Sequence, residues 1–205
     1  MTVTDVNVVK SAIFERPDDA NKGTLGSLLC VCGSYGMAGA AVMSAKGALR
    51  TGIGLAKCAL PRSIYPIVAQ TILESVYYPL SENADGRISK VNVPFLVSES
   101  CKSSATLVGC GLGVCDDTLK IVFSLIENST TTLVLDADAL NCVAKQPEIL
   151  LRKKAPIIIT PHPGEMSRLT GLATPLVNAE RERVALDFAQ KYGVVTVLKG
   201  AGTVI

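Results

Sequence analysis

The sequence predicts an α/β protein with a three-layer α/β/α fold around a mostly parallel central sheet. Short apolar runs alternate along the chain with segments of helical periodicity, which is the pattern of a parallel sheet covered on both faces. The run Ile157-Ile158-Ile159 is β-branched and contains no polar residue, as expected for a strand buried on both sides. A length of 205 residues, with no visible repeat or linker, predicts a single domain.

The first half of the chain contains three predicted strands. Val6, Val9 and Ile13 recur at helical spacing, and Pro17 ends that first helix. Pro61 closes the second apolar run because proline cannot donate to a strand ladder. The expected elements are a helix over 3–14, a strand over 25–32, a helix over 40–50, a strand over 53–60, a helix over 64–70, a strand over 74–79 and a helical or mixed segment over 94–101.

The second half repeats the alternation. Asp138 is expected to cap a helix. In the helix that Gly193 ends, Val184, Leu186 and Phe188 are predicted to face inward, while Arg181 faces outward. The expected elements are strands over 105–108, 132–135, 157–159 and 194–198, and helices over 117–127, 139–145, 165–169 and 179–192.

Composition restricts the possible partners and the compartment. The net charge is +2 without a basic tract, so no nucleic-acid partner is expected. No apolar run approaches the roughly 18 to 20 residues that a membrane span needs, and the charged N-terminus is unlike a signal peptide. The seven cysteines form no C-x-x-C pair and there is one histidine, so neither a disulfide framework nor a metal site is favoured. A cytoplasmic protein is expected.

Ligand-type residues follow five predicted strands: Gly33, Gly109, Asp136, His162 and Lys199. The carboxyl ends of parallel strands meet at one edge of a sheet, where ligands bind in open α/β folds. This convergence favours a nucleotide or phosphate site. Other interpretations remain for each position: tight packing for the glycine loops, turn capping for Asp136, a loop hydrogen bond for His162 and a solvated strand end for Lys199. P-loop, G-x-G-x-x-G and G-x-S-x-G motifs are absent.

Taken in order, several strings resemble the ADP- or ATP-dependent NAD(P)H-hydrate dehydratases, a family of ribokinase-like fold. The resemblance runs from about Lys22 to the last residue. It is carried by Lys22-Gly23-Thr24-Leu25-Gly26, Gly33-Ser34, Met37-Ala38-Gly39-Ala40-Ala41, Ala48-Leu49-Arg50-Thr51-Gly52-Ile53-Gly54-Leu55, Gly109-Cys110-Gly111-Leu112-Gly113, Leu135-Asp136-Ala137-Asp138-Ala139-Leu140-Asn141, Thr160-Pro161-His162-Pro163-Gly164-Glu165 and Leu198-Lys199-Gly200-Ala201-Gly202-Thr203.

The resemblance implies repair of hydrated NADH or NADPH. A nucleotide phosphate passes to the 6-hydroxyl of the damaged ring of (S)-NAD(P)H hydrate, and phosphate is then eliminated. ADP or ATP is the co-substrate, Mg²⁺ is expected, and a homo-oligomer, a tetramer, is implied. No metal ligand is assigned. The implied substrate contacts are Ala40, Gly111 and His162, with Asp136 and Asn141 lining the site, and the implied nucleotide contacts are Lys199, Gly200, Ala201, Gly202 and Thr203.

One departure affects catalysis. Such enzymes continue to a Gly-Ser-Gly-Asp-type motif that carries the general base, whereas this sequence ends at Ile205 without it. The expectation is therefore a single ribokinase-like domain over residues 1–205, incomplete at its C-terminus, with no catalytic residue of its own and weak binding without turnover. Two other functions remain open: a ribokinase-like kinase of the hydroxymethylpyrimidine or hydroxyethylthiazole type, and a non-catalytic nucleotide-binding protein.

Overall fold

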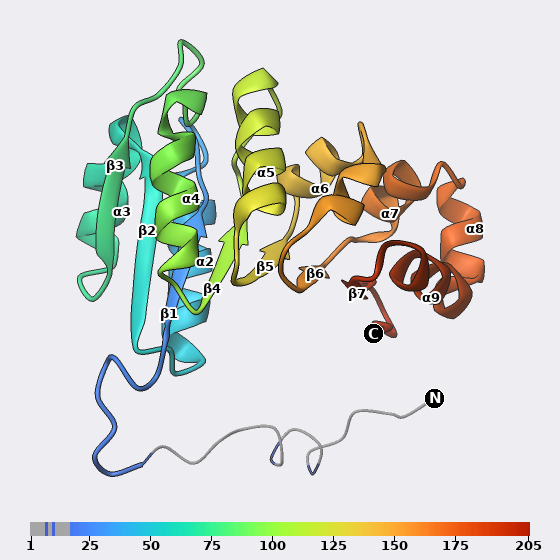
Figure 1. Cartoon of the computed structure of the whole chain (residues 1–205), viewed down its shortest axis with the longest axis horizontal. Coiled ribbons are helices and arrows are strands. Elements are labelled where there is room, and N and C mark those ends of the chain that lie inside the picture. Colours follow the sequence, from blue (N-terminus) through green and yellow to red (C-terminus); the bar gives the residue numbers. More distant parts are fainter. Residues whose placement is uncertain (1–6, 8–9, 11–16) are drawn as a thin grey trace.

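The computed structural model describes Asn7, Lys10 and residues 17–205. The helix predicted over 3–14 otherwise lies outside these residues. The described chain builds one seven-stranded sheet in the order β3-β2-β1-β4-β5-β6-β7, with helices packed against it (Figure 1). Every neighbouring pair of strands is parallel, which confirms the predicted sheet.

The strands agree with the predicted runs to within two residues at most ends. Three of them, over 105–108, 132–135 and 157–159, have the predicted bounds, whereas the last strand is shorter than predicted. After that strand the chain folds back through an isolated antiparallel bridge between Leu198 and Val204. The strands are β1 (Ser27–Val31), β2 (Leu55–Pro61), β3 (Val76–Leu80), β4 (Ala105–Val108), β5 (Thr132–Leu135), β6 (Ile157–Ile159) and β7 (Val195–Thr196).

The helices follow the strands as the alternation requires. The segment predicted as helical or mixed over 94–101 is helical. The helices are α2 (Ala38–Arg50), α3 (Tyr65–Thr71), α4 (Val93–Cys101), α5 (Asp116–Asn128), α6 (Asp138–Val143), α7 (Pro163–Thr170), α8 (Thr174–Ala179) and α9 (Arg181–Tyr192), with short 3₁₀ turns η1 (Arg62–Ile64), η2 (Lys90–Asn92) and η3 (Pro147–Arg152). No helix among these residues is long and apolar enough to cross a membrane.

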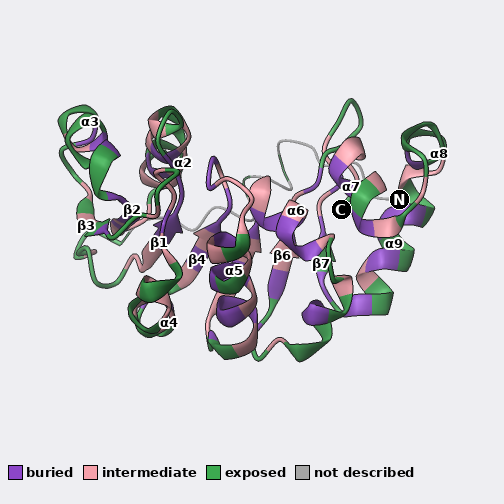
Figure 2. Cartoon of the chain, turned by 90° about the horizontal axis from the view of Figure 1, so that it is seen from above, coloured by how far each residue is buried: buried purple, intermediate pink, exposed green. Residues whose placement is uncertain are grey.

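The core lies on both faces of the sheet because side chains alternate along each strand. Leu29 and Val31 of β1 pack into a cluster that includes residues of α4 and α5. Cys30 and Cys32 pack on the opposite face, against α2 and α3. Figure 2 shows these two pairs of helices on opposite sides of the sheet. The strands must therefore be largely apolar on both faces, which explains why few polar residues, such as Lys57 in β2, interrupt their hydrophobic runs.

The helix predicted over 179–192 is present as α9, but it starts two residues later and one position predicted to face inward does not. The structure has two helices there, because Glu180 leaves the helical conformation at φ −124° and ψ 40°. Val184 and Phe188 are buried as predicted, but Leu186 is 56% exposed. The break separates α8 from α9 and turns Arg181 toward the loop that follows β7.

Candidate functional site

The five predicted strand ends lie along one edge of the sheet, as the sequence indicates. They follow β1, β4, β5, β6 and β7, which are consecutive neighbours. Backbone hydrogen bonds join the loops: Gly33 N–H donates to the Cys110 carbonyl at 2.8 Å, and Lys199 N–H donates to the Pro161 carbonyl at 2.8 Å. The ligand-type residues therefore form one continuous rim.

Asp136 is the centre of this rim. Its Oδ1 accepts from Lys199 Nζ at 2.6 Å and from Thr160 Oγ1 at 2.9 Å, and the Cys110 Sγ lies 3.6 Å from its Oδ2. Burial alone would raise the pKa of Asp136. The hydrogen bonds from Lys199 and Thr160 outweigh that effect, so the pKa of Asp136 lies below its ordinary value. Lys199 is thus not free: its side chain is partly solvated, but its ammonium is paired with an ionised carboxylate.

Ala40 and Gly111 lie against each other across the rim. A Cβ at Gly111, where φ is +67°, would lie 2.7 Å from the Ala40 Cβ. Ser34 Oγ donates to the Gly111 carbonyl at 2.8 Å, which ties the β1 loop to the β4 loop. The packing interpretation therefore holds for Gly111. A Cβ added at Gly39 would have no atom within 4 Å, so the first turn of α2 faces open space there.

His162 caps α7. Its Nδ1 accepts from the N–H groups of Gly164 at 3.0 Å and Glu165 at 3.3 Å, and the Glu165 carboxylate accepts from His162 N–H at 2.8 Å. These reciprocal bonds form a capping box. The loop hydrogen bond considered for this residue is therefore present. The imidazole is nevertheless 51% exposed, with its Nε2 at 3.4 Å from Glu165 Oε1, so its exposed surface remains available to a ligand.

Asp138 does not cap the following helix as predicted. Ala137 takes the capping position at φ +50°, and Asp138 is the first residue of α6. The Asp138 carboxylate instead accepts from Gly113 N–H at 2.8 Å and from Asn141 Nδ2 at 3.3 Å. Arg168 Nε donates to Asn141 Oδ1 at 2.9 Å. Asn141 thus holds a cation at the rim that no sequence motif indicated.

Arg181 fixes the loop over 198–203, although the sequence placed it outward. Its Nη2 donates to the Leu198 and Lys199 carbonyls at 2.8 and 3.0 Å, and its Nε donates to the Gly202 carbonyl at 3.2 Å. An open groove of about 680 Å³ lies beside this loop. Its lining residues are Asn178, Ala179, Glu180, Arg181, Glu182, Arg183, Gly202, Thr203 and Val204.

The rim has the chemistry of a site for small anionic molecules. In the described part of the chain, no group of three or more His, Cys, Asp or Glu side chains is placed to hold a metal ion. A paired lysine and carboxylate at the ends of parallel strands, beside exposed backbone, suit a phosphorylated ligand. By fold and site this is an α/β protein with a parallel sheet and a candidate ligand site at the carboxyl ends of its strands. A ribokinase-like superfamily protein from Enterococcus faecalis superposes with a TM-score of 0.75, 21% identity and coverage of 93% of this chain and 63% of that one.

Residues 28–205 match the NAD(P)H-hydrate dehydratase family, and the chain belongs to that family. It is 38% identical over 190 residues to the bifunctional NAD(P)H-hydrate repair enzyme of Thermofilum pendens, covering 93% of this chain and 36% of the relative. It resembles the ADP/ATP-dependent NAD(P)H-hydrate dehydratase of Bacillus subtilis, co-crystallised with ATP/Mg²⁺, with a TM-score of 0.78, 28% identity and coverage of 96% and 66%. The chain thus spans about a third of the first relative and two thirds of the second.

Proposed function

We propose that the protein acts in the ADP- or ATP-dependent dehydration of (S)-NAD(P)H hydrate to NAD(P)H. The observation that supports this most is the Lys199–Asp136 pair, with a separation of 2.6 Å between Nζ and Oδ1. Lys199 belongs to the loop over 198–203 and Asp136 follows β5, the neighbour of β4, so the pair joins that loop to the side of the glycine loops of β1 and β4. A phosphoryl group that passes from a nucleotide at one side to a hydroxyl at the other would cross it.

In this proposal the two sides have different ligands. Lys199, Gly200, Ala201, Gly202 and Thr203 hold the nucleotide, with its phosphates reached by the Lys199 ammonium. The hydrated dinucleotide contacts Ala40, Gly111 and His162. The cations beside it are Lys199, which Asp136 orients, and Arg168, which Asn141 orients. The protein positions the reactants and stabilises charge, as is usual for phosphoryl transfer.

Mg²⁺ is proposed to enter with the nucleotide. Mg²⁺ keeps several waters and is commonly held by one or two carboxylates together with substrate phosphates. Asp136 fits that requirement, because its Oδ1 is bonded to Lys199 and Thr160 while its Oδ2 has a weaker contact with the Cys110 thiol at 3.6 Å. The ion would neutralise phosphate charge during transfer.

The proposal is tested by calorimetry with residues 1–205, NADH hydrate, ATP and Mg²⁺, followed by an assay for recovery of NADH absorbance. None of the 17 glycines is followed by aspartate, so the aspartate implied as general base has no counterpart in this sequence. We expect both ligands to bind without turnover. Ready turnover would overturn the requirement for that aspartate. Phosphorylation of a hydroxymethylpyrimidine would instead support a kinase, and binding of ATP alone a nucleotide-binding protein.

His162→Ala should weaken NADH-hydrate binding and also destabilise the protein by about 1 kcal/mol, since α7 loses its cap. His162→Asn separates the two effects, because asparagine is a good capping residue but lacks the imidazole. We expect the asparagine variant to keep its denaturation midpoint and still to bind the hydrate weakly in calorimetry. Unchanged affinity in both variants would remove His162 from the substrate site.

We also propose a cytoplasmic homotetramer with a single ribokinase-like domain over residues 1–205. All seven cysteines are free thiols, and Cys30, Cys32, Cys58 and Cys142 are buried. Reduced, buried thiols suit a reducing compartment. Light scattering on the purified protein measures the assembly directly.

A further inference from the structure

A second cleft lies at the same edge of the sheet, beyond the loop that follows β1. It has a volume of about 360 Å³ and is lined by Tyr35, Ser63 and residues 82–86. This size is at the lower end of ligand clefts, which range over about 300–1,000 Å³. None of its lining residues is among those assigned above to the hydrated dinucleotide or to the nucleotide.

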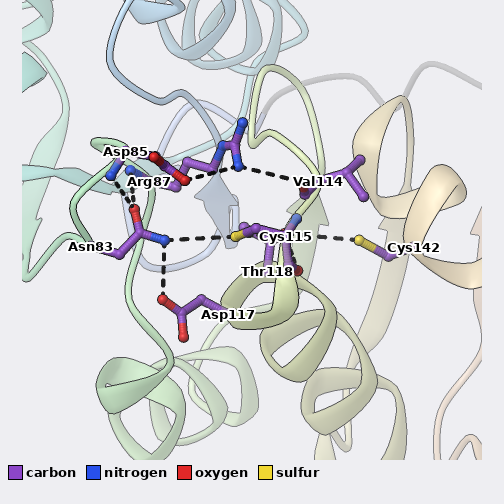
Figure 3. A network of polar contacts seen from close by, with 8 residues as sticks. All are labelled: Asn83, Asp85, Arg87, Val114, Cys115, Asp117, Thr118 and Cys142. Atoms are coloured by element: carbon purple, nitrogen blue, oxygen red, sulfur yellow. Dashed lines mark hydrogen bonds and ion pairs between the residues drawn. The ribbon is translucent and has the colours of Figure 1, made fainter.

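The outer wall of the cleft is a hairpin over residues 81–89. Asn83 holds its turn, since Asn83 Oδ1 accepts from the N–H groups of Asp85 and Arg87, both at 3.1 Å. Asn83 Nδ2 donates to Asp117 Oδ2 at 3.1 Å and so ties the hairpin to the start of α5 (Figure 3). Arg87 Nη1 reaches the Val114 carbonyl at 3.4 Å. The wall is therefore anchored to the β4 loop before any ligand binds.

Tyr35 forms the inner wall. Its ring belongs to a side chain that is 75% exposed, although its backbone is fixed. Tyr35 N–H donates to the Gly86 carbonyl at 2.8 Å. A Cβ at Gly86 would lie 2.4 Å from the Tyr35 Cβ, so the loop and the hairpin touch. An exposed aromatic ring on a fixed loop is a ready stacking platform for a nucleobase.

The polar lining suits a ribose. Glu82 and Asp85 are carboxylates, and carboxylates beside a nucleotide site accept from ribose hydroxyls. Ser63 Oγ donates to Glu82 Oε2 at 2.6 Å, which leaves the other Glu82 oxygen for a ligand. The Asp85 side chain is 68% exposed, and its Oδ2 lies 3.5 Å from Arg87 Nη1, which leaves its Oδ1 for a ligand. An aromatic ring next to hydroxyl-binding carboxylates matches the two halves of an adenosine.

Both the dinucleotide and the phosphate donor contain an adenosine, and the order of the strands determines which of the two can reach the cleft. Lys199 follows β7 at one end of the sheet, whereas the hairpin follows β3 at the other end. The neighbour of Tyr35 in the chain, Ser34, donates to the Gly111 carbonyl at 2.8 Å, so the cleft adjoins the glycine loops. A dinucleotide whose damaged ring lies near Asp136 must extend away from Lys199, toward Tyr35. The nucleotide bound at Lys199 cannot fill both places.

We propose that the cleft between Tyr35 and the hairpin over 81–89 binds the adenosine half of the hydrated dinucleotide, with the adenine stacked on Tyr35. This assignment rests on the proposed function, because it takes the dinucleotide as the ligand of the glycine loops.

Calorimetry with three variants and four ligands, the two hydrates, ADP-ribose and ATP, tests the assignment. Stacking losses predict that Tyr35→Ala weakens NADH-hydrate binding about tenfold, while Tyr35→Phe keeps the ring and the affinity. Hydrated reduced nicotinamide mononucleotide, which lacks the adenosine, should bind all variants equally. Leu73→Ala, at a side chain that is 84% exposed and outside both clefts, is the matched control. ADP-ribose added with saturating ATP probes the cleft without the hydrated ring.

The outcomes separate the two proposals. Tyr35-dependent binding of ADP-ribose without binding of either hydrate would keep the adenosine cleft and contradict the dehydratase substrate. Equal losses for the mononucleotide and the dinucleotide in Tyr35→Ala, or no loss for the dinucleotide and ADP-ribose, would overturn the cleft assignment. A loss confined to ATP would assign Tyr35 to the nucleotide donor and overturn it as well.

Discussion

Lys199→Met should lower ATP affinity at least tenfold while leaving the fold intact. Lys199 Nζ lies 2.6 Å from Asp136 Oδ1, so in the proposed complex it would bridge that carboxylate and the nucleotide phosphates. Hydrogen bonds to charged groups contribute about 1.5–3 kcal/mol, which corresponds to a loss of roughly 10- to 100-fold in affinity. Methionine keeps the length of the side chain without its charge. Isothermal calorimetry with ATP and Mg²⁺ measures the change.

The same variant has a signature in the pH dependence of stability. The pKa of Asp136 is lowered from its ordinary 3.8, so its carboxylate stabilises the wild type above that pH. This stability is lost as pH falls through the lower folded-state pKa. Without Lys199, burial is opposed by the hydrogen bonds from Thr160 and the Ala137 backbone alone, and the folded-state pKa rises. The thermal midpoint of the variant should therefore fall less than that of the wild type below about pH 4.

Lys154→Met is the matched control for both measurements. Lys154 is exposed and precedes β6, so it lies toward the opposite edge of the sheet from Lys199. The Lys154→Met substitution removes the same formal charge as Lys199→Met but leaves the contacts of Asp136 unchanged. The stability effect of the Lys199 change should be about 1 kcal/mol or less, because Lys199 is 41% exposed and solvent screens the pair. Equal ATP affinities in the two variants would exclude Lys199 from the nucleotide site.

The sheet was predictable because its strands are buried on both faces. Runs such as Ile157–Ile159 have no polar residue that could face solvent, which leaves a parallel strand as the natural assignment. The alternation with helices then requires all strands to run the same way. Once the strands are parallel, their carboxyl ends share one edge, and Asp136, His162 and Lys199 must meet there. The candidate site could therefore be predicted from topology before any contact was known.

The contacts within the site were less predictable because they depend on side-chain directions. Arg181 is on the charged side of a helical pattern, yet the break at Glu180 turns it onto the carbonyls of Leu198 and Lys199. Asp138 has the sequence position of a helix cap, but Ala137 occupies that position and Asp138 binds Gly113 instead. Local sequence rules predict neither arrangement, since the groups that Arg181 and Asp138 bind come from other segments of the chain.

Tyr35 and the hairpin over 81–89 were missed for a related reason. The segment over 81–90 is polar and rich in turn residues, so the sequence indicates a loop and nothing more. Its role depends on the contact between Gly86 and Tyr35, which are far apart in the chain. A glycine that permits close approach of another segment is visible only in the structure.

Gly109→Ala should be the most destabilising single methyl addition at the rim, costing more than about 3 kcal/mol. At Gly109 φ is +124°, and a Cβ there would lie 1.9 Å from the Asp136 carbonyl oxygen and 2.7 Å from the Ala139 nitrogen. Backbone atoms cannot rotate away as a flexible side chain can. The substitution must therefore separate β4 from the turn between β5 and α6, which also carries Asp136.

Gly36→Ala supplies the control for backbone strain. Gly36 also has a positive φ, +82°, but no atom lies within 4 Å of its Cβ position. An alanine there bears only the conformational cost of about 1–2 kcal/mol. Chemical denaturation should therefore rank the wild type above Gly36→Ala and Gly36→Ala above Gly109→Ala. Because the clash moves Asp136, the folded fraction of Gly109→Ala should also bind ATP more weakly than Gly36→Ala does. If the unfolding free energies of Gly36→Ala and Gly109→Ala differed by about 1 kcal/mol or less, no steric penalty would be present. The β4 loop would then move more easily than its contacts with Asp136 and Ala139 indicate.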